Sequence, residues 1–169
     1  MRRLVVASAI VLAGFAARAQ DTGLPFAGTG HDANKPIAVS ADSFIADLKN
    51  EKGVYSGNVV VTQGELKLRA NEVHVLAPGG KPQRLEARGN VVFASPSGNA
   101  QSDIGVYDVP SRIVTLSGHV VLTKDQNVMR GQALEIKLAS GEAKLISGKE
   151  AGERVQGLFT PSGNGKTGN

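Results

Sequence analysis

A short glycine motif that returns at a nearly constant spacing constrains the fold of this chain more than any other feature. It opens the segments Gly57–Thr62, Gly89–Phe93 and Gly118–Thr123, and a weaker fourth copy spans Ile146–Gly148. Successive glycines lie 32, 29 and 30 residues apart. A fixed period of about 30 residues is typical of stacked repeats. Because β-branched side chains dominate each copy, we predict that the repeat unit is made of strands.

A second, polar marker precedes each copy of the glycine motif. It falls at Asp42, Asn71, Asp103 and Gln132, with spacings of 29, 32 and 29 residues. Two of these residues are carboxylates, which raises the alternative of a catalytic pair. Their recurrence with the repeat period favours a structural role instead, such as satisfying backbone donors at a turn.

The strands between the markers alternate apolar and polar side chains. The clearest case is Leu66–Ala70, where leucine and alanine alternate with lysine and arginine. Such alternation is typical of a strand with one buried face. The motif glycine shares the parity of the apolar residues, and a glycine inside a strand marks a bend or a close approach of backbones. We therefore predict long strands that fold over at one corner, giving two sheets that face each other across a narrow apolar slot. No segment after Ala19 has a helical pattern.

The ends of the chain differ in composition from its centre. Residues 1–19 combine Arg2 and Arg3 with the apolar run Leu4–Ala17 and an A-x-A site that ends at Ala19, as in a secretory signal peptide. We expect cleavage after Ala19. Residues 20–35 are expected to form a flexible leader, residues 36–159 the folded domain, and residues 160–169 a disordered tail rich in Gly and Asn.

Charge and composition exclude a nucleic-acid-binding protein. The full chain has a formal net charge of +4, with 19 basic and 15 acidic residues. Without the three arginines of residues 1–19 the balance is 16 to 15, close to neutral. The chain has no block of like charge, no Trp, five Phe and two Tyr, so it lacks the footprint of a nucleic-acid binder. It also has no cysteine.

No motif in the sequence predicts an enzyme, a metal site or a cofactor. Gly163–Thr167 imitates the end of a phosphate-binding loop, but Thr160 stands where the pattern requires glycine. Gly28–Ala33 resembles a dinucleotide fingerprint without the strand that should precede it. The histidines, His31, His74 and His119, lie 43 and 45 residues apart. We interpret the last two as surface residues on the outward parity of their strands.

Five segments together resemble the LptA/OstA family of periplasmic lipopolysaccharide-transport proteins. They are Ala38–Asp42, Tyr55–Gly64, Leu66–Val75, Ser102–Asp108 and Leu116–Val120. Each motif alone is common, whereas their order and spacing together are specific. The resemblance covers roughly residues 36–145, and a histidine replaces the usual asparagine in the last segment.

This resemblance implies an all-β fold, an open β-jellyroll built from ~30-residue antiparallel strand repeats. It also implies a protein that carries lipopolysaccharide between two membranes, with an LptC-like inner-membrane partner, an LptD-like outer-membrane partner and head-to-tail homo-oligomers. The lipid A acyl chains are then expected to contact the inward parity of the strands. The expected lipid-binding residues are Val59, Val61, Leu66, Leu68, Val73, Val75, Val91, Phe93, Leu116, Val120, Leu122, Leu134 and Ile136.

Alternative interpretations of the same sequence remain at this stage. The inward residues can equally pack a closed core without binding lipid. The chain can be a membrane-anchored LptC-like subunit of the same pathway, or a structural β-solenoid or adhesin-like surface protein. A sheet that does not close leaves free strand edges, which we expect near Pro36–Val39 and Val155–Phe159, and such edges invite another chain to pair.

Overall fold

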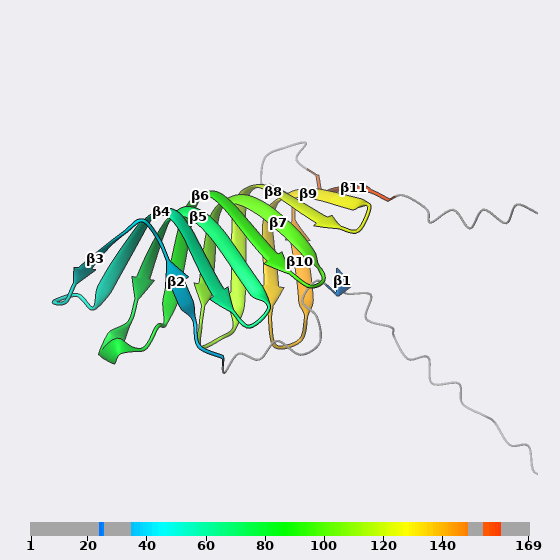
Figure 1. Ribbon diagram of the computed structural model, residues 1–169. Coiled ribbons are helices and arrows are strands. Elements are labelled where there is room, and N and C mark those ends of the chain that lie inside the picture. Colours follow the sequence, from blue (N-terminus) through cyan, green and yellow to red (C-terminus); the bar gives the residue numbers. More distant parts are fainter. Residues whose placement is uncertain (1–23, 26–34, 149–153, 160–169) are drawn as a thin grey trace, which may run out of the picture.

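The fold is an open, antiparallel β structure in which the strands from β4 to β10 each pair with their neighbours along the chain (Figure 1). The computed structural model describes residues 24–25, 35–148 and 154–159. The predicted signal peptide, most of the leader and the predicted tail lie outside these residues. The strands are β1 (Leu24–Pro25), β2 (Ala38–Ser40), β3 (Ser43–Asp47), β4 (Lys52–Gln63), β5 (Leu66–Leu76), β6 (Arg84–Ser95), β7 (Gly98–Asp108), β8 (Ile113–Lys124), β9 (Asn127–Lys137), β10 (Glu142–Ile146) and β11 (Gln156–Leu158).

The strand order is β1-β10-β9-β8-β7-β6-β5-β4-β2, with β3 also paired to β4 and β11 also paired to β9. Every pairing is antiparallel, and consecutive long strands are joined by short turns. One turn carries the 3₁₀ segment η1 (Pro78–Gly80), at the Pro/Gly-rich site. No helix among the described residues is long and apolar enough to cross a membrane. The predicted all-β open jellyroll is confirmed.

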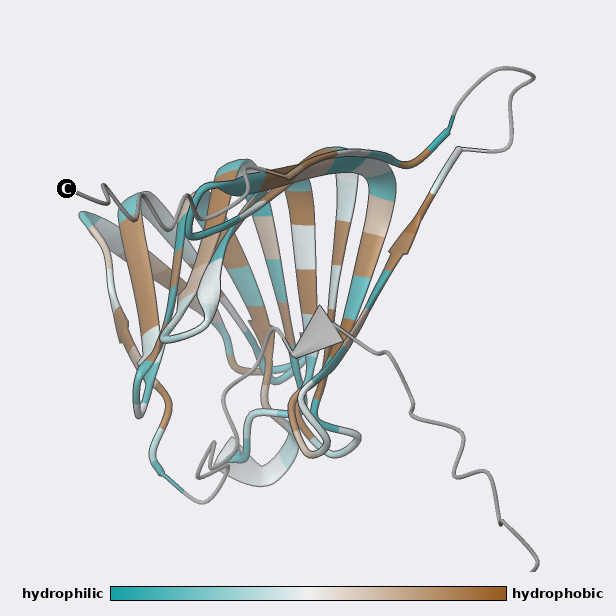
Figure 2. Cartoon of the chain, turned by 90° about the vertical axis from the view of Figure 1, so that its right-hand side faces the viewer, coloured by the Kyte–Doolittle hydropathy of each residue, from teal (hydrophilic) through white to brown (hydrophobic). Residues whose placement is uncertain are grey.

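Each long strand bends near its middle, so the sheet has two arms (Figure 2). The register shifts at the same level of every pair, for example between Ser56 and Val59 of β4. Neighbouring strands run in opposite directions, so the first arm takes the N-terminal halves of β4, β6 and β8 and the C-terminal halves of β5, β7 and β9. The short strands β3 and β10 also belong to the first arm. The second arm holds β2, β11 and the remaining halves. The line where the two arms meet is called the corner below.

The repeated glycine motif forms the corner. Three pairs of consecutive residues have left-handed backbone. The φ angles are 80° and 47° at Gly57–Asn58, 75° and 51° at Gly89–Asn90, and 79° and 46° at Gly118–His119. Glycine reaches this region without steric cost, and Asn and His occur there more often than most residues. Because two residues of the bent strand oppose one on its partner, each pair acts as a β-bulge that turns the strand.

The polar marker residues lie against these glycines from the neighbouring strand. A Cβ atom on Gly89 would come within 2.7 Å of Asn71 Nδ2. Asn58 Nδ2 donates a hydrogen bond of 2.8 Å to Asp42 Oδ2. His119 Nδ1 lies 2.7 Å from Asp103 Oδ2 in the third copy. Asp42, Asn71 and Asp103 thus have a structural role at the corner, but their partners are side chains of the bulge and not the backbone donors that were expected.

The core lies between the two arms. The largest side chains with the least exposure are Leu116, Leu122, Leu134 and Ile136. They come from β8 and β9, toward the C-terminal end of the stack. Strand alternation sends one face of each arm into this core and the other to solvent. The two arms therefore enclose one apolar strip that runs along the stack.

The ends of the stack are built from short strands. At the N-terminal end β2 and β3 together make up one strand that breaks at the corner beside Asp42. At the other end β10 and β11 lie on the two halves of β9, which places β11 at the edge strand predicted near Val155–Phe159. Within the expected leader, Leu24 and Pro25 pair with Ala143 and Glu142 of β10.

Candidate functional site

The apolar strip between the arms, here called the slot, contains all thirteen residues predicted to face inward. Eleven of them are buried, and the other two, Leu68 and Val75, are partly buried against the same cluster. Their orientation follows from strand alternation within each arm. The inward parity is the same on both sides of the corner in the bulged strand β6, whereas it inverts in β5 between Ala70 and Val73. The predicted direction of these side chains is confirmed. Contact with lipid stays a prediction.

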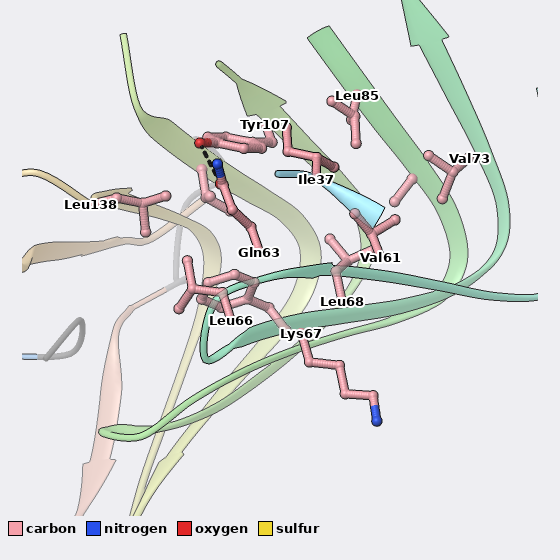
Figure 3. Close-up of a pocket in the computed structure, with 13 residues that line it drawn as sticks. Ile37, Val61, Gln63, Leu66, Lys67, Leu68, Val73, Leu85, Tyr107 and Leu138 are labelled. Atoms are coloured by element: carbon pink, nitrogen blue, oxygen red, sulfur yellow. Dashed lines mark hydrogen bonds between the residues drawn. The ribbon is translucent and has the colours of Figure 1, made fainter. Parts of the chain in front are cut away.

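The slot narrows to a small cavity on the side away from the corner, where the ends of the two arms approach each other (Figure 3). The cavity measures about 40 Å³, whereas about 10–15 Å³ is enough to hold one water. This region is called the mouth, and its residues are Ile37, Val61, Gln63, Leu66, Lys67, Leu68, Val73, Leu85, Ala87, Phe93, Tyr107, Val114 and Leu138. Side chains from both arms thus fill the slot in this structure.

A hydrogen bond joins the two arms across the mouth. Tyr107 Oη, from the first arm, donates to Gln63 Oε1, from the second arm, at 3.0 Å. Gln63 Nε2 in turn donates to the backbone oxygen of Lys35 at 3.0 Å. The Gln63 side chain is buried with 6% exposure, and burial raises the pKa of the Tyr107 phenol.

Sequence reasoning missed this polar pair. Gln63 shares the parity of Val59 and Val61, so its inward direction was available from alternation alone. Tyr107 lies 44 positions further along the chain, and no local pattern links the two residues. Met129, which is buried at 7% exposure, was missed because it follows a turn where the pattern is short.

The outward faces of the strands carry ordinary surface pairs. His74 Nε2 lies 2.5 Å from Glu72 Oε1, and this hydrogen bond is the main cause of a lowered pKa for Glu72. Hydrogen bonds from Arg88 likewise lower the pKa of Glu86. The outward placement predicted for His74 and His119 is confirmed. Within the described ranges no three His, Cys, Asp or Glu side chains gather as a metal site.

Both ends of the stack expose large apolar side chains. At the N-terminal end Phe44, Ile45 and Leu48 are 54%, 70% and 87% exposed, and the Phe44 ring packs 4.4 Å from that of Tyr55. At the C-terminal end the exposed apolar residues include Leu158 and Phe159. Apolar side chains on free strand edges are typical of surfaces that pair with another chain.

Comparison with known proteins connects this geometry to a family. Residues 38–142 match the profile of the family described as LptA/(LptD N-terminal domain) LPS transport protein. The chain belongs to the LptA family of lipopolysaccharide transport proteins. The matched residues run from β2 to the start of β10, so they include all three complete corners.

Individual relatives are similar to this chain over most of its length. The lipopolysaccharide export system protein LptA of Escherichia coli K12 is 28% identical over 167 residues, covering 94% of this chain and 84% of that protein. An uncharacterized protein of Rhizobium meliloti is 30% identical over 156 residues, covering 86% and 82%. In both cases the match covers more than four fifths of the relative.

A solved structure shows the same fold. The crystal structure of LptH, the LptA homologous periplasmic component of the lipopolysaccharide transport device of Pseudomonas aeruginosa, superposes with a TM-score of 0.69 at 22% identity. The match covers 78% of this chain and all of that one. The two-armed jellyroll is therefore the fold of the family.

Proposed function

We propose that this LptA-family protein binds lipopolysaccharide in the periplasm and shields its acyl chains between the two arms. The observation that carries the proposal is the apolar slot, which runs along the stack and is lined by side chains of both arms. Each methylene moved from water into such a slot contributes about 0.8 kcal/mol. Apolar side chains of similar size, such as Val91, Leu116 and Val120, bind an acyl chain without fixing its position along the slot, because they offer no polar anchor.

Binding requires the arms to move apart, because the cavity of about 40 Å³ holds no acyl chain. The corner is the natural hinge for this motion. Its bulges already interrupt the strand ladders, and away from the corner the arms are connected through side-chain packing and the hydrogen bond between Tyr107 and Gln63. When the arms open, their apolar side chains pack against the acyl chain instead of against each other, so the net cost of opening is small in the loaded protein.

Site-specific crosslinking tests the slot directly. Photo-crosslinking residues at Phe93 and Leu122, which are 3% and 1% exposed, should capture lipopolysaccharide. The matched controls are Arg69 and Glu135, which lie on the outward parity of β5 and β9. Equal capture at the inward and outward positions would refute the assignment of the slot.

The ends of the stack support a role as a bridge between an inner-membrane export complex and an outer-membrane assembly platform. Five-residue β3 and three-residue β2 form one end, and five-residue β10 and three-residue β11 form the other. Equal lengths allow β11 to pair with β2 of the next subunit, and β10 with β3 once β1 leaves Glu142 and Ala143. A head-to-tail contact does not close, so it extends into rods or docks onto a jellyroll partner at either membrane.

Truncation tests the head-to-tail contact. Deleting residues 152–169 removes β11 and with it Leu158 and Phe159. Oligomers measured by light scattering should become smaller, while the β-rich circular dichroism spectrum is retained. Oligomers of unchanged size would show that the C-terminal edge is not the contact.

Export to the periplasm is part of the same proposal. Mass spectrometry of the purified protein should find Gln20 at the N-terminus, because cleavage is expected after Ala19. An intact Met1 in the membrane fraction would instead favour the anchored LptC-like subunit.

A further inference from the structure

The mouth of the slot contains a polar pair in otherwise apolar surroundings. Ten of its thirteen lining residues are apolar, and the three others are Gln63, Lys67 and Tyr107. The Lys67 side chain carries its ammonium group away from the cavity (Figure 3). Gln63 and Tyr107 point toward each other and form the hydrogen bond between the arms.

A buried amide costs free energy compared with an apolar side chain of similar size unless its polar atoms are paired. Here the pairing is good, since Gln63 donates to the Lys35 carbonyl and accepts from the Tyr107 hydroxyl, each at 3.0 Å. A leucine at position 63 would fill the same place without needing either partner. The glutamine is therefore suited to something beyond packing the closed slot.

Admission of an acyl chain breaks this pair. The cavity is too small for a chain, so the arms must separate at the mouth, and separation removes the Tyr107 donor from Gln63 Oε1. Both groups then face the interior of the slot. A plain hydrocarbon cannot replace the lost hydrogen bond between Tyr107 and Gln63, whereas a hydroxyl group on the chain donates to Gln63 Oε1 and accepts from Tyr107 Oη at the same time.

We propose that Gln63 and Tyr107 are the specificity-determining pair of the slot, which closes the mouth of the empty protein and binds a hydroxyl group carried by an acyl chain. This inference rests on the proposed lipid binding and adds the chemical class of chain that the mouth prefers. The Gln63 amide nitrogen keeps its bond to Lys35 throughout, so the amide oxygen stays aimed at the ligand.

A competition assay tests this preference. The full mature protein is loaded with a dansyl-labelled fatty acid, which is then displaced by myristate or by each positional isomer of hydroxymyristate. At least one isomer should bind wild-type protein about 2- to 12-fold more tightly than myristate, the factor that corresponds to one net hydrogen bond. Tyr107→Phe, which removes only the hydroxyl, should abolish this preference.

Two further variants complete the design. Tyr55→Phe makes the same chemical change at the other tyrosine, whose ring packs on Phe44 outside the mouth, and should keep the preference. Gln63→Leu removes the other partner of the hydrogen bond and should also abolish the preference. If one of the two variants fails to fold, the other still decides the question. Circular dichroism and thermal unfolding identify such a failure.

The outcomes separate this inference from the proposed function. If lipopolysaccharide displaces the probe but wild-type protein prefers no hydroxymyristate isomer, the polar pair has no role in specificity while lipid binding stands. A preference that persists in both Tyr107→Phe and Gln63→Leu also overturns the inference. A wild-type protein that binds neither the probe nor lipopolysaccharide overturns the proposed function and the inference together.

Discussion

Replacing the corner glycine Gly89 by alanine should lower the free energy of unfolding. The loss has two parts, a backbone cost and the cost of a displaced side chain. At Gly89 the backbone has φ of 75°, and left-handed backbone costs a residue with a Cβ about 1–2 kcal/mol. The new Cβ would also lie 2.7 Å from Asn71 Nδ2, so the Asn71 side chain must move. That displacement weakens its hydrogen bond with Asn90, a loss of about 1 kcal/mol.

The expected loss for Gly89→Ala is therefore about 2–3 kcal/mol in the free energy of unfolding. At roughly 4 °C per kcal/mol for a domain of this size, Tm should fall by about 8–12 °C. Thermal unfolding followed by circular dichroism at low protein concentration measures both quantities without a contribution from oligomers.

The matched control is Gly79→Ala in the turn after β5. Gly79 has φ of 59°, but no atom lies within 4 Å of a Cβ built there. This variant therefore has only the backbone cost, about 1–2 kcal/mol. If Gly89→Ala is no more destabilising than Gly79→Ala, the contact between Asn71 and the corner glycine contributes nothing, and the structural role of the polar markers is refuted.

Other predictions concern the slot. Leu134→Ala should cost about 2–5 kcal/mol in the free energy of unfolding, because Leu134 is 0% exposed; a urea midpoint equal to that of wild type would show a slot that is loosely packed. Tyr55→Phe leaves Tyr107 as the remaining tyrosine, and its phenolate absorbance should appear at a pH above the ordinary value of 10, since burial favours the neutral phenol. Because the folded pKa of Tyr107 is raised, its contribution to stability is present below pH 10 and decreases as pH rises through the folded pKa; Tyr107→Phe should flatten this part of the pH–stability curve measured by urea unfolding.

The corner could be predicted from the sequence because its cause is local. A left-handed backbone at Gly57–Asn58 is a property of those two residues, and their repetition at Gly89–Asn90 marks the same bend in the next layer. The polar markers could be placed beside it because they share its period. His119 shows that the requirement is for the backbone conformation and a side-chain donor, which asparagine or histidine can supply.

The inward direction of the slot residues is equally a consequence of the sequence. Alternation with period two is fixed by the pleat of a strand, so the parity of Leu66 or Phe93 follows from their neighbours. The width of the slot does not follow in this way. It depends on the combined volume of side chains from both arms and on the bend angle at every corner, which are properties of residues far apart in the chain.

Tertiary structure alone therefore decided how the mouth is closed. Gln63 and Tyr107 meet because the two arms fold toward each other, although 44 positions separate them. The same holds for the pairing of Leu24–Pro25 with β10, which brings the start of the described chain to its far end. Local patterns specify which way a side chain points, whereas the partner it meets is set by the long-range packing of the arms.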